Sequence, residues 1–307
     1  MTGALARILK AKEIPFVEHA PTAPLSTFRI GGSCRYLVAP RCHGELMHAL
    51  DASSEVGLPI LIVGRGSNLL FEDGELPVAV LLTTAVNTIR EAGEGRFLAD
   101  CGASLSALSL MTARLGFADL AFAGGIPGTV GGGVLMNAGA HGNCLGELVE
   151  RVVALDIETG KITTFFNNQL VFSYRNSIFQ HGKWLILRVE LSCRERVEPT
   201  LALQRRSMLL ARRAATQPLH FPSAGSAFRR PATGVPLGRL FEELGLKGLS
   251  VGGATVSQKH AGFIVNTGNA TASDVRALIA KIQDITEDKC GFRPEPEIHF
   301  ASERIRI

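Results

Sequence analysis

The chain of 307 residues lacks paired cysteine motifs. Its six cysteines form no C-x-x-C pair and no His/Cys spacing of the kind that holds a metal ion. We therefore expect reduced thiols, no disulfide framework and no metal site. Reduced cysteines are typical of intracellular compartments, so this pattern favours a cytoplasmic protein.

Long apolar runs are absent as well. Residues 1–21 contain no continuous apolar segment of the signal-peptide kind, and no stretch reaches the roughly 18 apolar residues that span a bilayer. We expect no insertion into a membrane.

The sequence has no long block of charge of one sign. The net charge of +4 comes from Lys and Arg spread along the chain, with one local cluster in residues 203–213. This distribution does not require nucleic acid as a partner, because a small ligand that carries phosphate would be enough to use these charges.

What is present is an ordinary globular composition, with 46% hydrophobic residues, in a chain long enough for about two or three domains. No internal repeat and no regular βαβ alternation occurs. Residues 27–82 alternate short apolar runs with turns, residues 86–193 combine strands with a glycine-rich stretch, and the remainder begins with an Arg-rich helical segment. The pattern predicts an α+β fold.

Apolar periodicity predicts individual elements within these regions. We expect strands at 34–40, 58–64, 151–157 and 161–166, a further apolar run at 184–192, and helices at 44–57, 106–116, 201–215 and 271–285. A turn at 158–160 joins two of the strands, and Thr271 with Asp274 suits a capping box.

The stretch "AFAGGIPGTVGGGVLMNAGAHG", residues 121–142, contains eight glycines. Glycine inside an element costs roughly 0.5–1 kcal/mol relative to alanine, so this density needs a reason. A flexible linker would be polar, whereas Phe122, Ile126 and Val134 are residues of the buried type. The composition favours a loop whose bare backbone lies against a ligand.

A second bare loop follows the predicted strand at 58–64, in "GRGSNL", residues 64–69. A strand that ends in G-x-G presents several backbone N–H groups at one point, which suits a pyrophosphate. Leu69 stands where the Rossmann pattern needs a third glycine, and no Gly-Lys-Ser/Thr of a P-loop occurs. Alone, this loop fits a simple turn equally well; together, the two loops favour a dinucleotide.

The chain resembles the UDP-N-acetylenolpyruvoylglucosamine reductases, flavoenzymes of bacterial cell-wall synthesis. The motifs that carry the resemblance occur in the family's order and are "STFRIGG", "VGRGSNLL", "AGGIPGTVGGGVLMNAGAHG", "FSYRNSIF", "PSAGSAFRRP", "LKGLSVGGATVSQKHAGFIVNTGNATASDV" and "PEPEI". The resemblance implies the two-subdomain FAD-binding module shared with vanillyl-alcohol-type oxidases, in residues 1–85 and 86–200. An α+β domain that binds the UDP-sugar substrate would follow in residues 201–307.

The resemblance also implies which residues bind FAD, with NADPH as its reductant. We expect the FAD to be noncovalent, because neither loop offers a His or Cys at an obvious attachment position; His141 and Cys144 are the nearest candidates. Those expected at the cofactor are Gly64, Arg65, Gly66, Ser67, Asn68, Leu69, Gly124, Gly125, Ile126, Pro127, Gly128, Thr129, Asn137 and Gly139.

Three residues are expected to carry the reaction. Hydride addition to an enolpyruvyl ether pushes negative charge toward the substrate carboxylate, so a cation must stabilise it. By resemblance Arg175 is this catalytic cation, Ser226 is the proton donor and Glu297 is the acidic partner of Arg175. Glu295 would share a face with Glu297 in a regular strand, so periodicity leaves the two carboxylates equal and only the motif favours Glu297.

The resemblance places four more residues at the substrate with less force, since a solvated surface position is a rival for the charged ones: Tyr174, Arg230, Lys259 and His260. No tyrosine lies between Phe179 and Pro222, which indicates the branch without a tyrosine lid. Two alternatives stay open, an oxidase on the same flavin fold and a flavin- or UDP-sugar-binding module without catalysis. The joint presence of the three expected catalytic residues favours the reductase.

Overall fold

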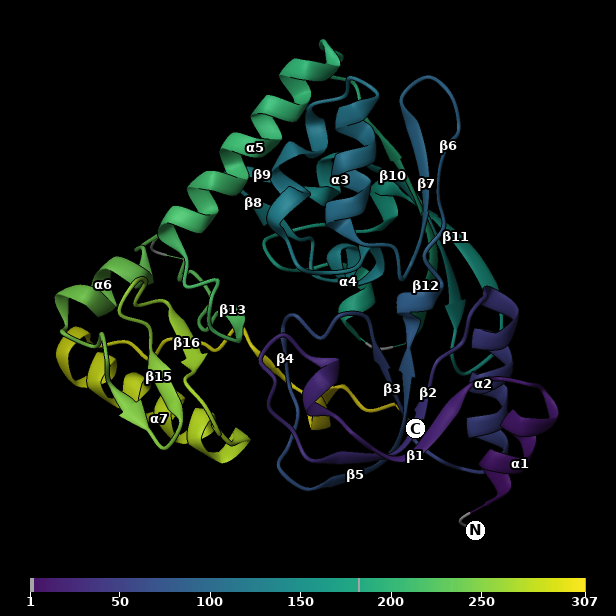
Figure 1. Ribbon diagram of the computed structural model, residues 1–307, viewed down its shortest axis with the longest axis horizontal. Helices are drawn as coiled ribbons and strands as arrows, with labels where there is room; N and C mark the ends of the chain where they lie inside the picture. Colours follow the sequence, from purple (N-terminus) through teal and green to yellow (C-terminus); the bar gives the residue numbers. More distant parts are fainter. Residues whose placement is uncertain (1–2, 182, 233, 307) are drawn as a thin grey trace.

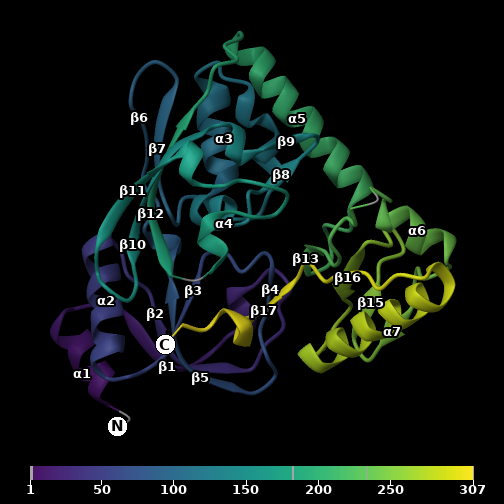
Figure 2. The ribbon, with the colours of Figure 1, turned by 180° about the vertical axis from the view of Figure 1, so that it is seen from behind.

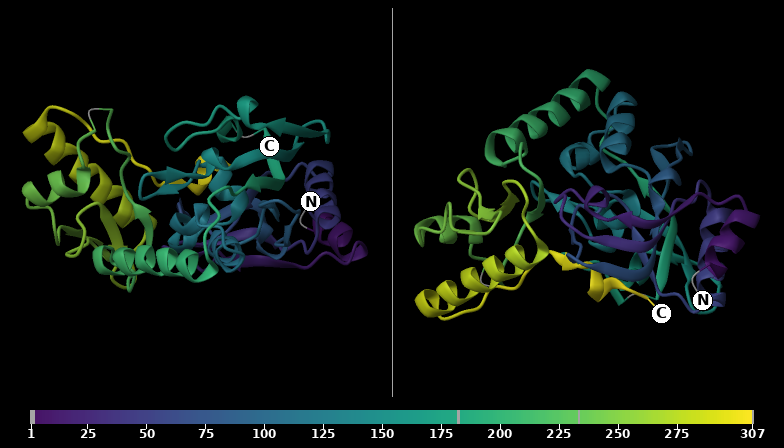
Figure 3. Two further views of the ribbon diagram at one scale, coloured as in Figure 1. Left: turned by 90° about the horizontal axis from the view of Figure 1, so that it is seen from above. Right: turned by 60° about the horizontal axis from the view of Figure 1, so that its bottom comes forward.

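The computed structural model describes residues 3–181, 183–232 and 234–306. Three sheets form successive units along the chain (Figure 1). Helix α5 (Pro199–Thr216) runs diagonally from the second unit to the third, which stands at one end of the molecule, away from α1 and α2 (Figure 3). None of the described helices is long and apolar enough to cross a membrane.

The first unit is a four-stranded sheet in the order β1-β2-β5-β3. Its strands and helices are β1 (Phe16–Pro21), β2 (Ser33–Val38), β3 (Ile60–Val63), β5 (Glu75–Leu82), α1 (Ala4–Ala11) and α2 (His43–Glu55). β5 pairs in parallel with both β2 and β3, which puts the carboxyl end of β3 and the loop after it at one edge. Alternate residues of β2, Cys34, Tyr36 and Val38, are buried, as period-two patterning requires.

The second unit is an antiparallel sheet in the order β11-β10-β12-β7-β6. Its strands are β6 (Ile89–Glu91), β7 (Arg96–Asp100), β10 (Val149–Asp156), β11 (Ile162–Phe166) and β12 (Trp184–Ser192). The predicted turn between β10 and β11 is present: Gly160 has a φ of 69° and its N–H donates to the Asp156 carbonyl at 2.9 Å.

The glycine-rich stretch lies within this second unit but outside its sheet. It forms the 3-10 turns η3 (Asp119–Gly125), the short helix α4 (Val130–Leu135) and the small hairpin of β8 (Gly139–Ala140) and β9 (Asn143–Cys144). α3 (Leu105–Arg114) and α5 both pack against η3. The stretch is therefore an ordered part of the core and no linker, as its apolar residues indicated.

The third unit is an antiparallel sheet in the order β13-β16-β15-β14, packed against two helices. Its elements are β13 (Ser223–Ser226), β14 (Ser250–Val251), β15 (Ala254–Val256), β16 (Phe263–Asn266), α6 (Leu237–Glu243) and α7 (Ala272–Cys290). The predicted capping box at the start of α7 is confirmed, since Asp274 N donates to Thr271 Oγ1 and Thr271 N to the Asp274 carboxylate, both at 3.0 Å. Gly291, with a φ of 74°, ends the helix.

The chain finally returns from the third unit to the first (Figure 2). β17 (His299–Phe300) pairs in parallel with β4 (Leu69–Leu70), and Arg306 pairs with Ile60 next to the first sheet. Phe28 and Leu70 of the first unit belong to the same apolar core as Phe241 and Ile279 of the third. These contacts join the two units, and they lie beside the loop that follows β3.

Candidate functional site

The two bare loops that the sequence singled out lie against each other. A Cβ on Gly64, which directly follows β3, would stand 2.4 Å from Thr129 Oγ1. Thr129 caps α4 by accepting a hydrogen bond from Gly132 N at 3.3 Å. A Cβ on Gly128 would meet nothing closer than Ser67 Oγ at 3.5 Å. Gly128 is buried, yet a Cβ would fit there, so the protein's own packing does not require glycine at this position. A ligand that lies against its backbone would account for the glycine.

Two of the expected cofactor glycines, in contrast, face helix α5. A Cβ on Gly124 would stand 2.9 Å from Arg206 Nε, and one on Gly125 would stand 2.7 Å from Arg213 Cδ. The absence of side chains here lets two arginines of α5 lie on η3. Packing therefore accounts for these two glycines, and their contact with a cofactor stays a prediction.

Arg206 and Arg213, which lie on η3, are further candidate site residues. The sequence indicated only the basic cluster at 203–213 to which they belong. Burial lowers the pKa of both Arg206 and Arg213, which means that their charge is costly where it lies. Arg206 donates to Ser106 Oγ at 3.0 Å, but its Nε is buried without a partner among the described residues. The guanidinium of Arg213 likewise makes no hydrogen bond or ion pair with the described residues. Half-buried guanidinium groups with unpaired nitrogens are suited to bind an anion such as a diphosphate.

The rest of the expected cofactor set is spread around the two loops. Arg65 and Pro127 are exposed, while Gly66, Ser67, Asn68, Leu69 and Ile126 are buried or half-buried. Gly66 has a φ of 56°, and a Cβ there would stand 2.2 Å from the Leu25 carbonyl, so the turn requires glycine.

Asn137 and Gly139, after α4, lie next to the predicted catalytic loop. Asn137 Nδ2 donates to the Ser173 carbonyl at 2.9 Å, and its Oδ1 accepts from Gly146 N at 2.9 Å. The Gly139 carbonyl accepts from Arg175 Nη1 at 3.4 Å. The glycine-rich stretch is thereby tied to the segment that contains Arg175.

Arg175 and Glu297 form an ion pair across two units of the chain. Arg175 Nε donates to Glu297 Oε1 at 2.7 Å, and the two side chains are 25% and 10% exposed. The hydroxyl of Tyr174 lies 3.4 Å from the other oxygen, Glu297 Oε2, and accepts from Arg230 N at 3.3 Å. Four of the predicted residues, from segments 55 residues and more apart, are therefore brought together.

The structure distinguishes the two carboxylates that periodicity left equal. Residues 295–297 form no regular strand and pair only through an isolated bridge between Pro296 and Phe228. Glu295 is 77% exposed and lies 3.7 Å from Arg229, whereas Glu297 is enclosed by Arg175 and Tyr174. The contacts of the two side chains therefore separate them where periodicity could not.

Ser226 ends β13 directly after Gly225, whose φ is 81°. The side chain is exposed, and the carbonyl of the next residue, Ala227, accepts from Glu297 N at 2.8 Å. Asn68 Nδ2 donates to the Glu297 carbonyl at 3.0 Å. Hydrogen bonds to the backbone of Glu297 therefore link its segment to the Ser226 segment and to the loop after β3.

Lys259 and His260 make contacts elsewhere. Lys259 Nζ donates to the Ala214 carbonyl near the end of α5 at 2.6 Å. The ring of His260 packs inside the third unit, where Nδ1 accepts from Gly262 N at 3.1 Å and burial lowers the pKa of the imidazole. These contacts do not bring either side chain to the Arg175–Glu297 pair, so their place at a substrate stays a prediction.

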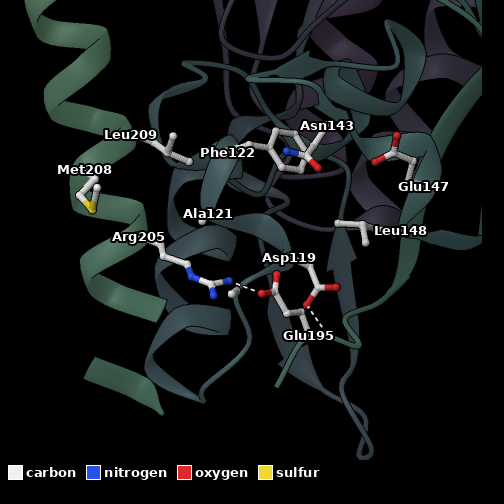
Figure 4. Close-up of a pocket in the computed structure, with 11 residues that line it drawn as sticks. Asp119, Ala121, Phe122, Asn143, Glu147, Leu148, Glu195, Arg205, Met208 and Leu209 are labelled. Carbon is white, nitrogen blue, oxygen red and sulfur yellow. Dashed lines mark hydrogen bonds and ion pairs between the residues drawn. The ribbon is translucent and has the colours of Figure 1, made fainter. Parts of the chain in front are cut away.

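A surface pocket of about 420 Å³ opens between α5 and η3 (Figure 4). Arg205 forms an ion pair with Glu195 at its rim, and Asp119 there accepts from the backbone N–H groups of residues 194 and 195. The residues that line it include Phe122 and Leu209 but none of those predicted for the site. It is a separate hollow. Within the described part of the chain, no three His, Cys, Asp or Glu side chains gather so as to hold a metal ion.

Comparisons with known proteins agree with this arrangement. Residues 34–165 match the family described as "FAD binding domain", and residues 217–301 match "UDP-N-acetylenolpyruvoylglucosamine reductase, C-terminal domain". The α+β class and the succession of an FAD-binding module and a C-terminal domain are thereby confirmed.

Relatives match almost from end to end. The chain is 40% identical over 305 residues to the UDP-N-acetylenolpyruvoylglucosamine reductase of Caldanaerobacter subterraneus subsp. tengcongensis, covering 99% of each. It is 42% identical over 276 residues to that of Thermotoga petrophila, covering 90% of this chain and 95% of the relative. The crystal structure of the reductase from Thermus caldophilus superposes with a TM-score of 0.77 at 31% identity, over 94% of this chain and 98% of that one. The chain belongs to the UDP-N-acetylenolpyruvoylglucosamine reductase family.

Proposed function

We propose that this protein reduces the enolpyruvyl ether of UDP-N-acetylglucosamine-enolpyruvate to UDP-N-acetylmuramate, a peptidoglycan precursor, with NADPH as reductant and noncovalent FAD. The observation that supports the proposal is the ion pair of Arg175 and Glu297. It joins two units of the chain beside the two glycine loops, in a protein that belongs to this reductase family.

The residues present fit FAD. A dinucleotide and its diphosphate would be held by the backbone at Gly128, the neighbouring loop at 64–69 and the guanidinium of Arg213, which pairs with none of the described residues. When bound, FAD accepts hydride from NADPH and supplies it to the terminal carbon of the enolpyruvyl double bond. Burial, with the nearby Glu147 carboxylate, raises the pKa of the Cys144 thiol, and a thiol with a raised pKa is a poor nucleophile for attachment to a flavin.

Arg175 stabilises the charge that develops on the substrate. Its Nε is engaged by Glu297, so the guanidinium is fixed on one side, while its Nη2 has no hydrogen-bond partner among the described residues. The terminal nitrogens can therefore bind the substrate carboxylate. Glu297, with both oxygens in contact with the protein, holds the guanidinium in that orientation.

Ser226 donates the proton that completes the reduction. Its exposed hydroxyl stands on the segment adjacent to Glu297, so it can reach the carbon next to the carboxylate that Arg175 binds. Arg230, Tyr174, Lys259 and His260 would line the path of the UDP-sugar.

The experiment that tests the function is an absorption titration of the purified protein. We expect a flavin spectrum that NADPH bleaches and that UDP-N-acetylglucosamine-enolpyruvate then restores without oxygen, with UDP-N-acetylmuramate as product. Acid precipitation should release all the flavin. Fast restoration by oxygen alone would instead indicate the oxidase, and a flavin that NADPH never bleaches would indicate a binding module.

A further inference from the structure

Gln180 has no role in the proposed reaction, but its side chain holds the loop that contains Arg175 in place through hydrogen bonds. Gln180 Nε2 donates to the Arg175 carbonyl and to the Leu135 carbonyl, both at 3.2 Å. The same nitrogen lies 3.0 Å from Met136 Sδ. One half-buried amide therefore fastens the backbone of Arg175 to the end of α4, the helix inside the glycine-rich stretch.

This fastening acts on a strained backbone. Arg175 has a φ of 54°, in the left-handed region that costs a residue with a side chain about 1–2 kcal/mol. Such a conformation persists only where the surroundings determine it. Two other hydrogen bonds, both of 2.9 Å, hold the same loop: Asn137 donates to the Ser173 carbonyl, and Ser177 Oγ donates to the Leu135 carbonyl. Among the described residues, however, only Gln180 donates to the carbonyl of Arg175 itself.

Gln180 is in turn oriented by Arg304. Arg304 Nη2 donates to Gln180 Oε1 at 2.6 Å and Nη1 donates to the Gln180 carbonyl at 3.1 Å. With its oxygen held by the guanidinium, the amide must direct its nitrogen to the Arg175 carbonyl. Arg304 therefore orients the amide of Gln180, and Gln180 in turn holds the backbone of Arg175.

Arg304 also contacts His299, which lies in the same segment as Glu297. Arg304 Nη2 lies 3.2 Å from His299 Nε2, and since a guanidinium only donates, this ring nitrogen is the acceptor. His299 is therefore neutral, in keeping with a pKa lowered to about 4 by burial first and by Arg304 and Arg229 second. His299 stands two residues after Glu297, so both partners of the ion pair are tied to one internal network.

We propose that Gln180 is a positioning residue for Arg175, and that Arg304 positions Gln180. The inference rests on the proposed function. Without the amide, the loop keeps its fold through Asn137 and Ser177, but the Arg175 backbone relaxes and its guanidinium turns away from the substrate carboxylate. The loss then falls on enolpyruvyl reduction and leaves the reaction with NADPH unchanged.

The test is stopped-flow measurement of both half-reactions in Gln180→Leu and Gln180→Glu. Leucine removes the amide at similar size; glutamate keeps an acceptor for Arg304 but has no N–H for Arg175. We expect both variants to retain FAD and their melting temperature and to be bleached by NADPH at the wild-type rate. Reoxidation by UDP-N-acetylglucosamine-enolpyruvate should slow by about 10-fold or more, the scale that corresponds to the net contribution of one intramolecular hydrogen bond.

Two controls separate positioning from a general structural role. Gln169→Leu removes a glutamine whose Oε1 accepts from Phe166 N at 2.8 Å, in the same part of the chain but without contact to Arg175, and should leave both half-reactions unchanged. In a double-mutant cycle, Gln180→Leu should add little to the loss already caused by Arg175→Lys, because both changes act through one guanidinium.

Wild-type reoxidation in both Gln180 variants, equal slowing of both half-reactions, or fully additive losses in the cycle would each overturn the inference. Should Gln180→Leu lose its flavin, Gln180→Glu, which preserves the contact with Arg304, decides by the same criteria. A wild-type enzyme that the UDP-sugar does not reoxidise would instead refute the proposed function, so the two failures are distinguishable.

Discussion

At the scale of single residues, the site depends on a carboxylate that is engaged by the protein on both oxygens. Glu297 contacts Arg175 through Oε1 and Tyr174 through Oε2, and its backbone N–H and carbonyl are bound by Ala227 and Asn68. The sequence could indicate Glu297 only by its motif, because Glu295 and Glu297 would share a face in a regular strand and periodicity could not separate them. The contacts that distinguish the two carboxylates could not be predicted from the sequence, and the role of Glu297 stays a prediction.

Changing either member of the pair should slow reduction of the enolpyruvyl group. Arg175→Lys replaces a planar fork by a point charge, and Glu297→Gln removes the anion that fixes the guanidinium. We expect losses of about 10²-fold or more in reoxidation by substrate, the scale for one preorganised charge-stabilising group. Glu295→Gln is the matched control, since its side chain is 77% exposed and should leave turnover intact. Equal effects at 295 and 297 would contradict the assignment.

Replacement of Ser226 should separate hydride transfer from proton transfer. Ser226→Ala should keep its FAD, be bleached by NADPH normally and still bind the UDP-sugar, yet turn over roughly 10²–10⁴-fold more slowly, as for loss of a positioned acid. Ser226→Cys should recover part of the rate because a thiol also donates. The control is Ser54→Ala, an exposed position in α2. Stopped-flow kinetics of both half-reactions decide, and an alanine variant reoxidised at the wild-type rate would assign the proton to another group or to water.

At the scale of elements, the glycines of the glycine-rich stretch differ in what surrounds them. Gly128 has room for a Cβ beside Ser67, whereas Gly124 and Gly125 make room for arginines of α5. A sequence reveals that side chains are missing but not what fills the space, because α5 begins 74 residues after η3 ends. The strands β14 and β15 have only two and three residues, too few for an alternating pattern to be detected.

Enlarging Gly128 tests the cofactor loop without disturbing the protein. Because a Cβ there would meet its nearest atom at 3.5 Å, Gly128→Ala should fold normally and weaken FAD binding, and Gly128→Val should purify colourless with the third unit still folded. Flavin content per chain and the melting temperature measure the two effects. Gly44→Val, in α2, where the nearest atom would be Cys42 Sγ at 3.8 Å, should retain its flavin. Full flavin occupancy in Gly128→Val would show that no cofactor lies against this residue.

At the scale of the whole molecule, the third unit is fixed to the first by contacts between distant parts of the chain. β17 pairs with β4 across 230 residues, and the same apolar core contains residues of both units. The composition predicted three regions and their α+β class, but a two-residue parallel pair has no local signal, so the return of the chain could not be predicted from periodicity. The domain limits at residues 85 and 200 stay predictions. The return places Glu297 beside Arg175, so the proposed site depends on it.

Asp73 should contribute measurably to this docking. Its carboxylate accepts from Ala272 N at 2.6 Å, from Ser273 N at 3.0 Å and from Ser273 Oγ at 2.8 Å, in the first turn of α7. Burial alone would raise the pKa of Asp73, but these hydrogen bonds outweigh it and lower the pKa below 3.8. A carboxylate with a depressed native pKa stabilises the fold above its unfolded pKa, and this contribution is lost as the pH falls through the native value.

We expect Asp73→Ala to destabilise the protein by about 1–2 kcal/mol in urea unfolding at pH 7, as for loss of a helix cap, with faster hydrogen exchange in α7. The difference from wild type should shrink as the pH falls below the usual range of an aspartate, because the carboxylate is then protonated. Asp51→Ala, exposed in α2, is the control, and an Asp73 variant as stable as this control would mean that Asp73 contributes nothing to the docking of the two units.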